Sequence, residues 1–181
     1  MPPRPTPADL AAAVGRQVPD VLAPGLRVLF CGINPGLWSA AVGHHFARPG
    51  NRFWRALHLG GFTPRLLAAD EEAELLRLRL GITNLVDRAS AGAADLTREE
   101  LRAGAGRLTA KVARVRPAAV AVLGVGAYRT AFARPRASVG PQPDPIGPAR
   151  AWVLPNPSGL NAHYQLPDLA AAFAALRHGL D

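Results

Sequence analysis

Two loops with similar sequences carry the side chains that are best suited to chemistry. Residues 34–37 read Asn-Pro-Gly-Leu, and residues 156–160 read Asn-Pro-Ser-Gly-Leu. The proline pushes each asparagine away from helical backbone, and the nearby glycine lets backbone approach a ligand closely. The amide of Asn34 or Asn156 can donate and accept hydrogen bonds, so either could hold a water molecule or pair with the polar edge of a ring. The alternative interpretation is two ordinary Asn-Pro turns.

The elements around these loops indicate an α/β fold with both loops at one edge of a sheet. Apolar runs of strand length occupy residues 26–33, 81–86, 118–124 and 151–155. Helical patterns occupy 51–62, 71–82, 96–116, 126–133 and 166–180, and the Pro/Gly-rich stretch 134–150 is predicted to be a loop. Strands that alternate with helices predict a parallel sheet covered on both faces. Ligands of such sheets bind beyond the carboxyl ends of the strands, so the loops after the strands should hold the functional residues.

The composition indicates one globular domain that is strongly basic. The chain has 181 residues, of which 49% are hydrophobic and 19% charged, and its formal net charge is +8. Such a charge favours nucleic acid as a partner. The alternative is that codon usage in a GC-rich genome supplies the arginines whatever the function, since Lys111 is the only lysine. No run of 18 apolar residues occurs, which predicts no membrane span. We expect a flexible tail with a possible short helix over residues 1–20 and a single domain over 21–181.

Three features bear on cofactors, and none of them predicts one. Cys31 is the only cysteine, which excludes an intrachain disulfide, and its place in an apolar strand predicts a buried thiol. The sequence Gly-Val-Gly-Ala-Tyr-Arg at 124–129 lacks the third glycine of a dinucleotide-binding loop. His44 and His45 are adjacent, and adjacent residues seldom ligate one ion well. We therefore expect neither a metal nor an organic cofactor.

Four segments together form a pattern that is more specific than either loop alone. They read FCGINPGL (30–37), GHHFARPGNRFWRAL (43–57), ITNLVDR (82–88) and WVLPNPSGL (152–160). In this order they closely resemble the mismatch-specific uracil/thymine DNA glycosylases of the uracil-DNA glycosylase superfamily, and the resemblance runs over residues 21–176. It implies a three-layer α/β/α sandwich with a central four-stranded, mainly parallel sheet. It also implies an enzyme that flips a nucleotide out of the duplex and excises its base.

The resemblance gives the two asparagines different roles. Asn34 matches the residue that positions the water for attack on C1′ of the sugar. Asn156 stands where strict uracil enzymes place a histidine, so weaker stabilisation of the departing base anion and slow turnover are expected. Asp95 is a further catalytic candidate from its place after the second strand. Its carboxylate could accept the proton of the water, unless it is a helix cap or a solvated loop residue. Asp87 is expected to brace its loop through an arginine.

The same resemblance predicts a base pocket that admits more than uracil. Phe46 matches the aromatic residue that stacks on the extruded base, with core packing as the alternative. Backbone groups around Ile33, Pro35 and Gly36 could bind the carbonyl oxygens of the base. Gly36 also stands where strict uracil enzymes carry a tyrosine that blocks the 5-methyl group of thymine. Thymine and ethenocytosine should therefore not be excluded at that point.

The second loop is expected to contact the DNA around the extruded nucleotide. Leu160 matches the apolar residue that is inserted into the gap in the duplex. Gly159 gives it room, and the backbone of Pro157, Ser158 and Gly159 could pair with the guanine left behind. Asn161 follows in place of an arginine or lysine, so either the grip on the opposite strand is weaker or His163 supplies it.

These expectations define one enzyme hypothesis and two alternatives. We expect a monofunctional glycosylase that acts on double-stranded DNA with G:U or G:T mismatches. It should act as a monomer in the cytoplasm, associated with DNA, with no membrane and no obligate protein partner. No lysine occurs in the four loops, so a Schiff-base step is not expected. The alternatives are a catalytically weak protein that binds mismatched or abasic DNA, and a nucleotide-binding α/β enzyme that uses residues 124–129.

Overall fold

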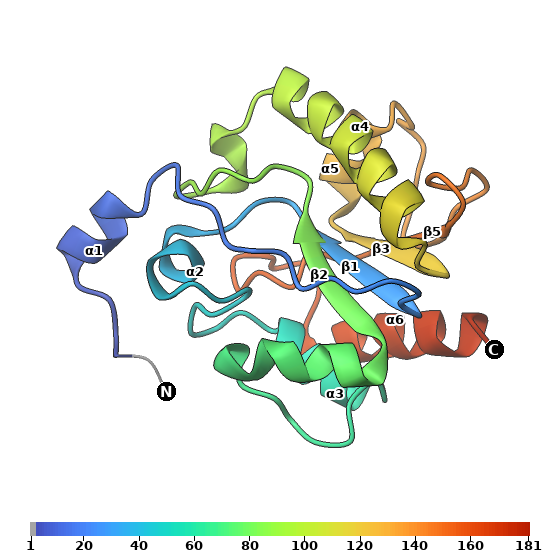
Figure 1. Ribbon diagram of the computed structural model, residues 1–181, viewed down its shortest axis with the longest axis horizontal. Coiled ribbons are helices and arrows are strands. Elements are labelled where there is room, and N and C mark those ends of the chain that lie inside the picture. Colours follow the sequence, from blue (N-terminus) through green and yellow to red (C-terminus); the bar gives the residue numbers. More distant parts are fainter. Residues whose placement is uncertain (1–2) are drawn as a thin grey trace.

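A five-stranded sheet forms the centre of the computed structural model, which describes residues 3–181 (Figure 1). Its four parallel strands are β1 (Val28–Gly32), β2 (Leu80–Asn84), β3 (Ala119–Leu123) and β5 (Arg150–Leu154). The strand order is β2-β1-β3-β5-β4, and β4 (Gly140–Pro141) pairs antiparallel with β5. The loops that follow β1, β2, β3 and β5 therefore open at the same edge of the sheet.

The expected number of four strands is wrong because of β4. This strand has two residues and lies within the stretch 134–150 that the sequence predicts as a loop. A two-residue strand has no periodicity to detect, and proline in a sheet is confined to positions such as this outer edge. The four strands that the sequence does predict are the parallel ones, and they carry the loops at the candidate site.

Helices cover both faces of the sheet and complete three layers (Figure 1). One face carries α3 (Phe53–Leu59), the 3-10 helix η1 (Ala69–Leu78) and α6 (Leu166–Gly179). The other face carries α4 (Arg98–Val115) and α5 (Val125–Ala131). Successive strand residues pack into opposite cores, so Phe30 meets Phe53 edge-on at 5.5 Å while Cys31 packs on the α4 side. The Cys31 thiol is fully buried, and this burial raises its pKa.

The N-terminal segment carries a short helix and contacts the region after β1. Helix α1 (Pro7–Ala12) is capped by Thr6, whose hydroxyl accepts a hydrogen bond from the backbone N–H of Asp9 at 3.2 Å. Ala13 and Val18 are buried against Ala40 of α2 (Leu37–Val42). Part of the expected tail over 1–20 is thus packed on the domain, and residues 1 and 2 lie outside the described range.

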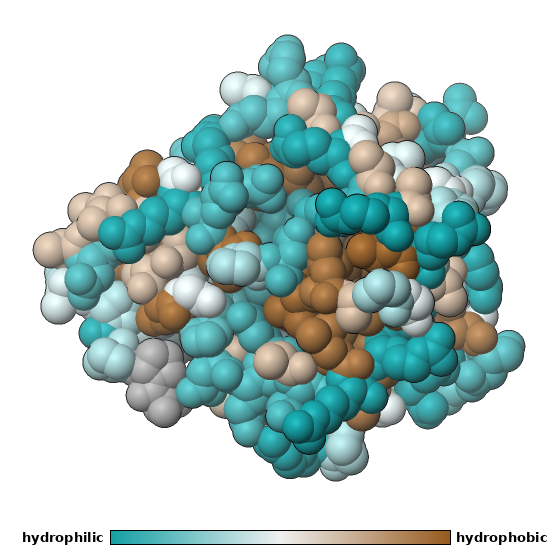
Figure 2. Space-filling model, in the orientation of Figure 1, coloured by the Kyte–Doolittle hydropathy of each residue, from teal (hydrophilic) through white to brown (hydrophobic). Residues whose placement is uncertain are grey.

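Most of the surface in view is polar (Figure 2). Hydrophilic side chains cover most of it, and hydrophobic ones gather where the edge strand β2 lies (Figures 1 and 2). Over residues 3–181, none of the helices combines the length and the apolar character needed to cross a bilayer.

Candidate active site

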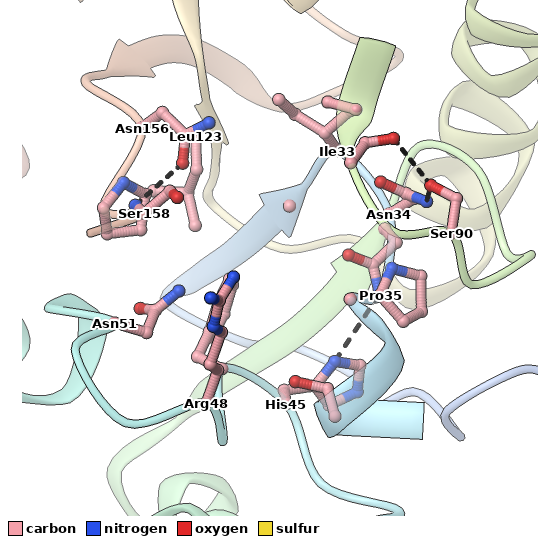
Figure 3. Close-up of a pocket in the computed structure, with 18 of the residues that line it drawn as sticks. Ile33, Asn34, Pro35, His45, Arg48, Asn51, Ser90, Leu123, Asn156 and Ser158 are labelled. Atoms are coloured by element: carbon pink, nitrogen blue, oxygen red, sulfur yellow. Dashed lines mark hydrogen bonds between the residues drawn. The ribbon is translucent and has the colours of Figure 1, made fainter. Parts of the chain in front are cut away.

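A cavity of about 170 Å³ opens at the carboxyl edge of the sheet (Figure 3). Its walls come from the loop after β1, from residues 84 and 90–93 after β2, from the loop after β5, and from the segment 45–51 before α3. Asn34 and Leu160, which are far apart in the chain, line this same cavity. Cavities of about 150 Å³ in proteins hold benzene, so the space matches a single six-membered ring.

Asn34 is fixed so that its amide oxygen remains available. Its Nδ2 donates to the carbonyl oxygen of Arg88 at 2.9 Å and to Oγ of Ser90 at 2.8 Å. An amide nitrogen has two hydrogens, so both are used by these contacts. Oδ1 is then the polar atom left to face the cavity, where it can accept a hydrogen bond from a water molecule and orient its lone pair (Figure 3).

The loop after β2, which accepts both hydrogen bonds from the Asn34 amide, is braced by an ion pair between Arg88 and Glu100. Arg88 Nε lies 2.5 Å from Glu100 Oε1, and Arg88 Nη2 donates to the carbonyl oxygen of Asp95 at 2.9 Å. The Arg88 guanidinium lowers the pKa of Glu100 to about 2, helped by the backbone N–H of Thr97. The expected brace through Asp87 is replaced by this pair, because Arg88 turns toward α4.

Asp95 lies at the end of η2 (Ala93–Asp95), and its carboxylate has a local partner. Oδ2 accepts a hydrogen bond from the backbone N–H of Gly92 at 3.0 Å, which closes the first turn of this short helix. Gly92 and Ala93 line the cavity, whereas Asp95 is not among its lining residues. Asp95 therefore shapes the wall that Gly92 and Ala93 form.

Phe46 stands between the cavity and the hydrophobic core. One face of its ring stacks on Phe53 with the centroids 4.2 Å apart and the planes at 28°. The ring also lines the cavity next to Gly32, where a Cβ would lie 3.3 Å from it. Its backbone has a φ of 53°, a left-handed conformation that costs a non-glycine residue about 1–3 kcal/mol. Both expected roles of Phe46, core packing and a wall for the base, therefore have a structural basis.

Asn84 and His45 form a polar wall of the cavity that the sequence did not predict. His45 Nε2 lies 2.8 Å from the carbonyl oxygen of Pro19, so this nitrogen carries the proton. The other ring nitrogen then accepts from Nδ2 of Asn84 at 3.5 Å, which sets the orientation of the Asn84 amide. A Cβ on Gly32 would lie 2.6 Å from Asn84 Oδ1, so only glycine at this position leaves the amide in place.

Asn156 presents a donor to the cavity from the opposite loop. Its Oδ1 accepts from the backbone N–H of Ser158 at 3.0 Å (Figure 3). Its carbonyl oxygen accepts from Nδ2 of Asn161 at 3.0 Å. These bonds order the loop and leave the Asn156 side-chain N–H groups for a ligand. Leu160 at the tip of the loop is 78% exposed, which is unusual for a large apolar side chain.

Arg52 joins the segment before α3 to the Leu160 loop, a role that sequence reasoning missed. Its Nη2 donates to the carbonyl oxygens of Ser158 at 2.6 Å and Asn161 at 3.1 Å, and its Nη1 donates to that of Tyr164. Its backbone N–H donates to the carbonyl oxygen of Pro157 at 3.0 Å. The arginine inside the Asn-Arg-Phe-Trp block gave no indication of this, because its partners lie more than a hundred residues away.

Most of the residues that the sequence proposed for the site surround one space. The cavity is lined by Ile33, Asn34, Pro35, Gly36, Phe46, Asn156, Pro157, Ser158 and Leu160. Gly159 and Asn161 lie on the outer sides of the same loop, in neighbouring hollows. Within residues 3–181, no three His, Cys, Asp or Glu side chains are grouped as a metal ion requires.

Two comparisons with known proteins agree with this geometry. The model of the Uracil DNA glycosylase superfamily matches residues 19–177. The solution NMR structure of a candidate uracil DNA glycosylase from Methanosarcina acetivorans has a TM-score of 0.62 and 21% sequence identity, and the match covers 91% of this chain and 98% of that one. The structural likeness shows a shared fold. Because the family model spans nearly the whole chain, the protein belongs to the Uracil DNA glycosylase superfamily, a family of DNA glycosylases.

Proposed function

We propose that the protein hydrolyses the N-glycosidic bond of uracil mispaired with guanine, and that it also releases thymine and ethenocytosine opposite guanine. The observation that carries this proposal is the shared cavity of Asn34 and Leu160 at the sheet edge, with a volume that suits one pyrimidine ring. The mismatch supplies part of the selectivity, because a wobble pair costs less to open than a Watson–Crick pair. The proposed substrate is double-stranded DNA, bound by a monomer.

The proposed reaction begins when the nucleotide leaves the stack. Leu160 fills the gap in the duplex, and the extruded base enters beside Phe46. The Asn84 amide is positioned to pair with the polar edge of the base. Water held by Oδ1 of Asn34 forms a bond to C1′ of the sugar while the bond from C1′ to the base nitrogen breaks, and the bonding pair leaves with the base. The water proton passes to solvent or to the departing base.

Fixed dipoles are the main catalytic element of this scheme. Asn34 cannot take up a proton, so the protein must stabilise the base anion as it forms. The Asn156 side-chain N–H groups and the Asn84 amide supply neutral donors for this purpose. Neutral donors stabilise an anion less than charged ones, which predicts slow release of the base. We propose no role for Asp95 in proton transfer, because its side chain is not among those that line the cavity.

The absence of a side chain at Gly36 supports the wider substrate range. A Cβ at this position would meet nothing within 4 Å, so the space beside the base is open. The backbone of Gly36 has a φ of −75°, which any residue can adopt. The width of the pocket is therefore a consequence of side-chain size and not of backbone strain.

The test is single-turnover base release from duplexes with uracil, thymine or ethenocytosine opposite guanine and opposite adenine. Wild type is expected to release uracil fastest from the G·U pair. Asn34→Ala should lower the rate by about 100-fold or more while duplex affinity stays nearly the same, because the substitution removes the water contact. Duplex binding without release of any base by the wild type would refute the proposal and support a catalytically silent mismatch binder.

A further inference from the structure

A second hollow lies beside the base cavity and has no part in the proposed reaction. It has a volume of about 500 Å³ and lies between α2, the segment 46–51, α3 and residues 67–70. Phe46, Arg48 and Asn51 line both spaces. The segment 46–51 is therefore a ridge with the base cavity on one side and this groove on the other.

The groove is lined by arginines that are available to bind an anion. Arg48 and Arg55 are exposed, and within residues 3–181 neither guanidinium has a hydrogen bond or an ion pair. Arg4 also lines the groove and lies over the ring of Trp38 at 5.5 Å. Asp70 is the only acidic residue among the lining side chains, and it already takes part in another interaction. Three arginines against one engaged carboxylate give this groove a positive charge.

An aromatic ring offers a platform in the same groove. Trp38 of α2 is half-buried and lines the groove, so part of its ring reaches the open space. Trp54 is buried and its indole N–H donates to the carbonyl oxygen of His45 at 3.2 Å, which makes it a fixed wall. A positive groove with a partly exposed indole is a combination that suits single-stranded nucleic acid: arginines follow the phosphates, and bases stack on the ring.

We propose that this groove binds single-stranded DNA that continues from the base cavity, with phosphates at Arg48 and Arg55 and a base on Trp38 beside Arg4. The inference rests on the proposed function, because a base that enters the neighbouring cavity is what places the strand next to the groove. Arg48 is the link between the two spaces: it lines both of them and points into the base cavity beside Asn51 (Figure 3). The phosphate that joins the extruded nucleotide to its neighbour is therefore placed at Arg48.

This assignment has a consequence for the form of the substrate. A strand held on both sides of the ridge is held without contacts to the opposite strand. The protein is then expected to bind single-stranded DNA that contains no uracil at all, and to do so through the groove. The groove and the base cavity share lining residues, so one DNA strand can occupy both at once. An acidic peptide would need only the groove, so this continuity favours DNA as the ligand.

The test measures the dissociation constant of a fluorescently labelled oligothymidylate by anisotropy at several salt concentrations. Trp38→Leu should weaken binding by about fivefold or more through lost stacking. Arg55→Gln should weaken binding and make the salt dependence shallower by about 0.7 in the log–log slope, the value for one phosphate contact on a single strand. Arg102→Gln is the control, because Arg102 is exposed on α4, on the other face of the sheet, and carries the same charge.

The outcomes separate the groove from the enzyme activity. Unchanged oligothymidylate binding in both Trp38→Leu and Arg55→Gln, or an equal loss in Arg102→Gln, would overturn the proposal that the groove binds DNA, even if the wild type releases uracil. Oligothymidylate binding that depends on both Trp38 and Arg55 would support that proposal, even if the wild type releases no base from a G·U duplex. Arg55 is exposed and makes no side-chain bond within residues 3–181, so Arg55→Gln remains informative if Trp38→Leu folds poorly.

Discussion

Substitution of Gly159 by alanine tests how Leu160 is held at the mouth of the cavity. A Cβ on Gly159 would lie 2.8 Å from the carbonyl oxygen of Gly50 and 3.3 Å from its carbonyl carbon, both backbone atoms. The loop cannot easily move aside, because Arg52 donates to the carbonyl oxygens of Ser158 and Asn161 on the two sides of this position. Overpacking of this kind costs about 1–3 kcal/mol. Since each 1.4 kcal/mol is a factor of ten, the native arrangement of the loop should become about 5- to 150-fold less populated.

The assay compares single-turnover uracil release from a G·U duplex and from a single-stranded uracil oligonucleotide. The Gly159→Ala rate should fall by about fivefold or more on the duplex, where Leu160 must replace a stacked base. The loss should be smaller on the single strand, which has no gap to fill. Gly106→Ala is the matched control: a Cβ there would meet nothing within 4 Å, and alanine in this helix interior is expected to raise stability by about 0.5–1 kcal/mol.

A Gly159→Ala variant that keeps its duplex rate within about twofold would contradict this role of Gly159, because the overlap would then be relieved at almost no cost. An equal loss on duplex and single strand, together with a lower Tm, would instead mean that the substitution unfolds the protein and does not merely displace the loop.

Three further substitutions separate chemistry from architecture. Asp95→Asn keeps an oxygen that accepts from the backbone but cannot take a proton, so we expect single-turnover release within about threefold of wild type; a loss of about 100-fold would indicate proton transfer. Gly36→Tyr should lower thymine release relative to uracil by about tenfold or more in competition on G·T and G·U duplexes, because the ring occupies the space beside the 5-position. Glu100 has a folded-state pKa of about 2, below its ordinary value of 4.5, so its ion pair with Arg88 stabilises the fold above that ordinary value and is lost as the pH falls toward 2. Thermal unfolding of Glu100→Gln should therefore show a flatter dependence on pH over this window than the wild type does.

The parallel core was predictable because its determinants are local. Apolar runs of strand length gave β1, β2, β3 and β5 to within a few residues. Thr97 and Glu100 exchange the two hydrogen bonds of a capping box at the start of α4, as their spacing predicts. β4 was missed because two residues carry no pattern. The segment 71–82, predicted as a helix, is a 3-10 helix that ends at Leu78.

The polar walls of the site were not predictable in the same way, because they depend on contacts between distant segments. Asn34 could be proposed from its own neighbours in sequence, but the use of both its amide hydrogens depends on the loop after β2. The orientation of Asn84 depends on His45, and that of His45 on Pro19. Asp95 was proposed from its place after the second strand, and its side chain caps a short helix by accepting from the backbone N–H of Gly92, a group that sequence patterns do not register.

The buried thiol of Cys31 makes the protein unusually convenient for site-specific chemistry. No second cysteine exists in the sequence, and this one has no exposed surface and an elevated pKa, so alkylating reagents find no thiolate in the native state. A Leu160→Cys variant would carry a single reactive sulfur at the loop tip. A spin label or a disulfide to a thiol-modified nucleotide at that sulfur could then report when this tip enters the helix of the nucleic acid, without any background substitution.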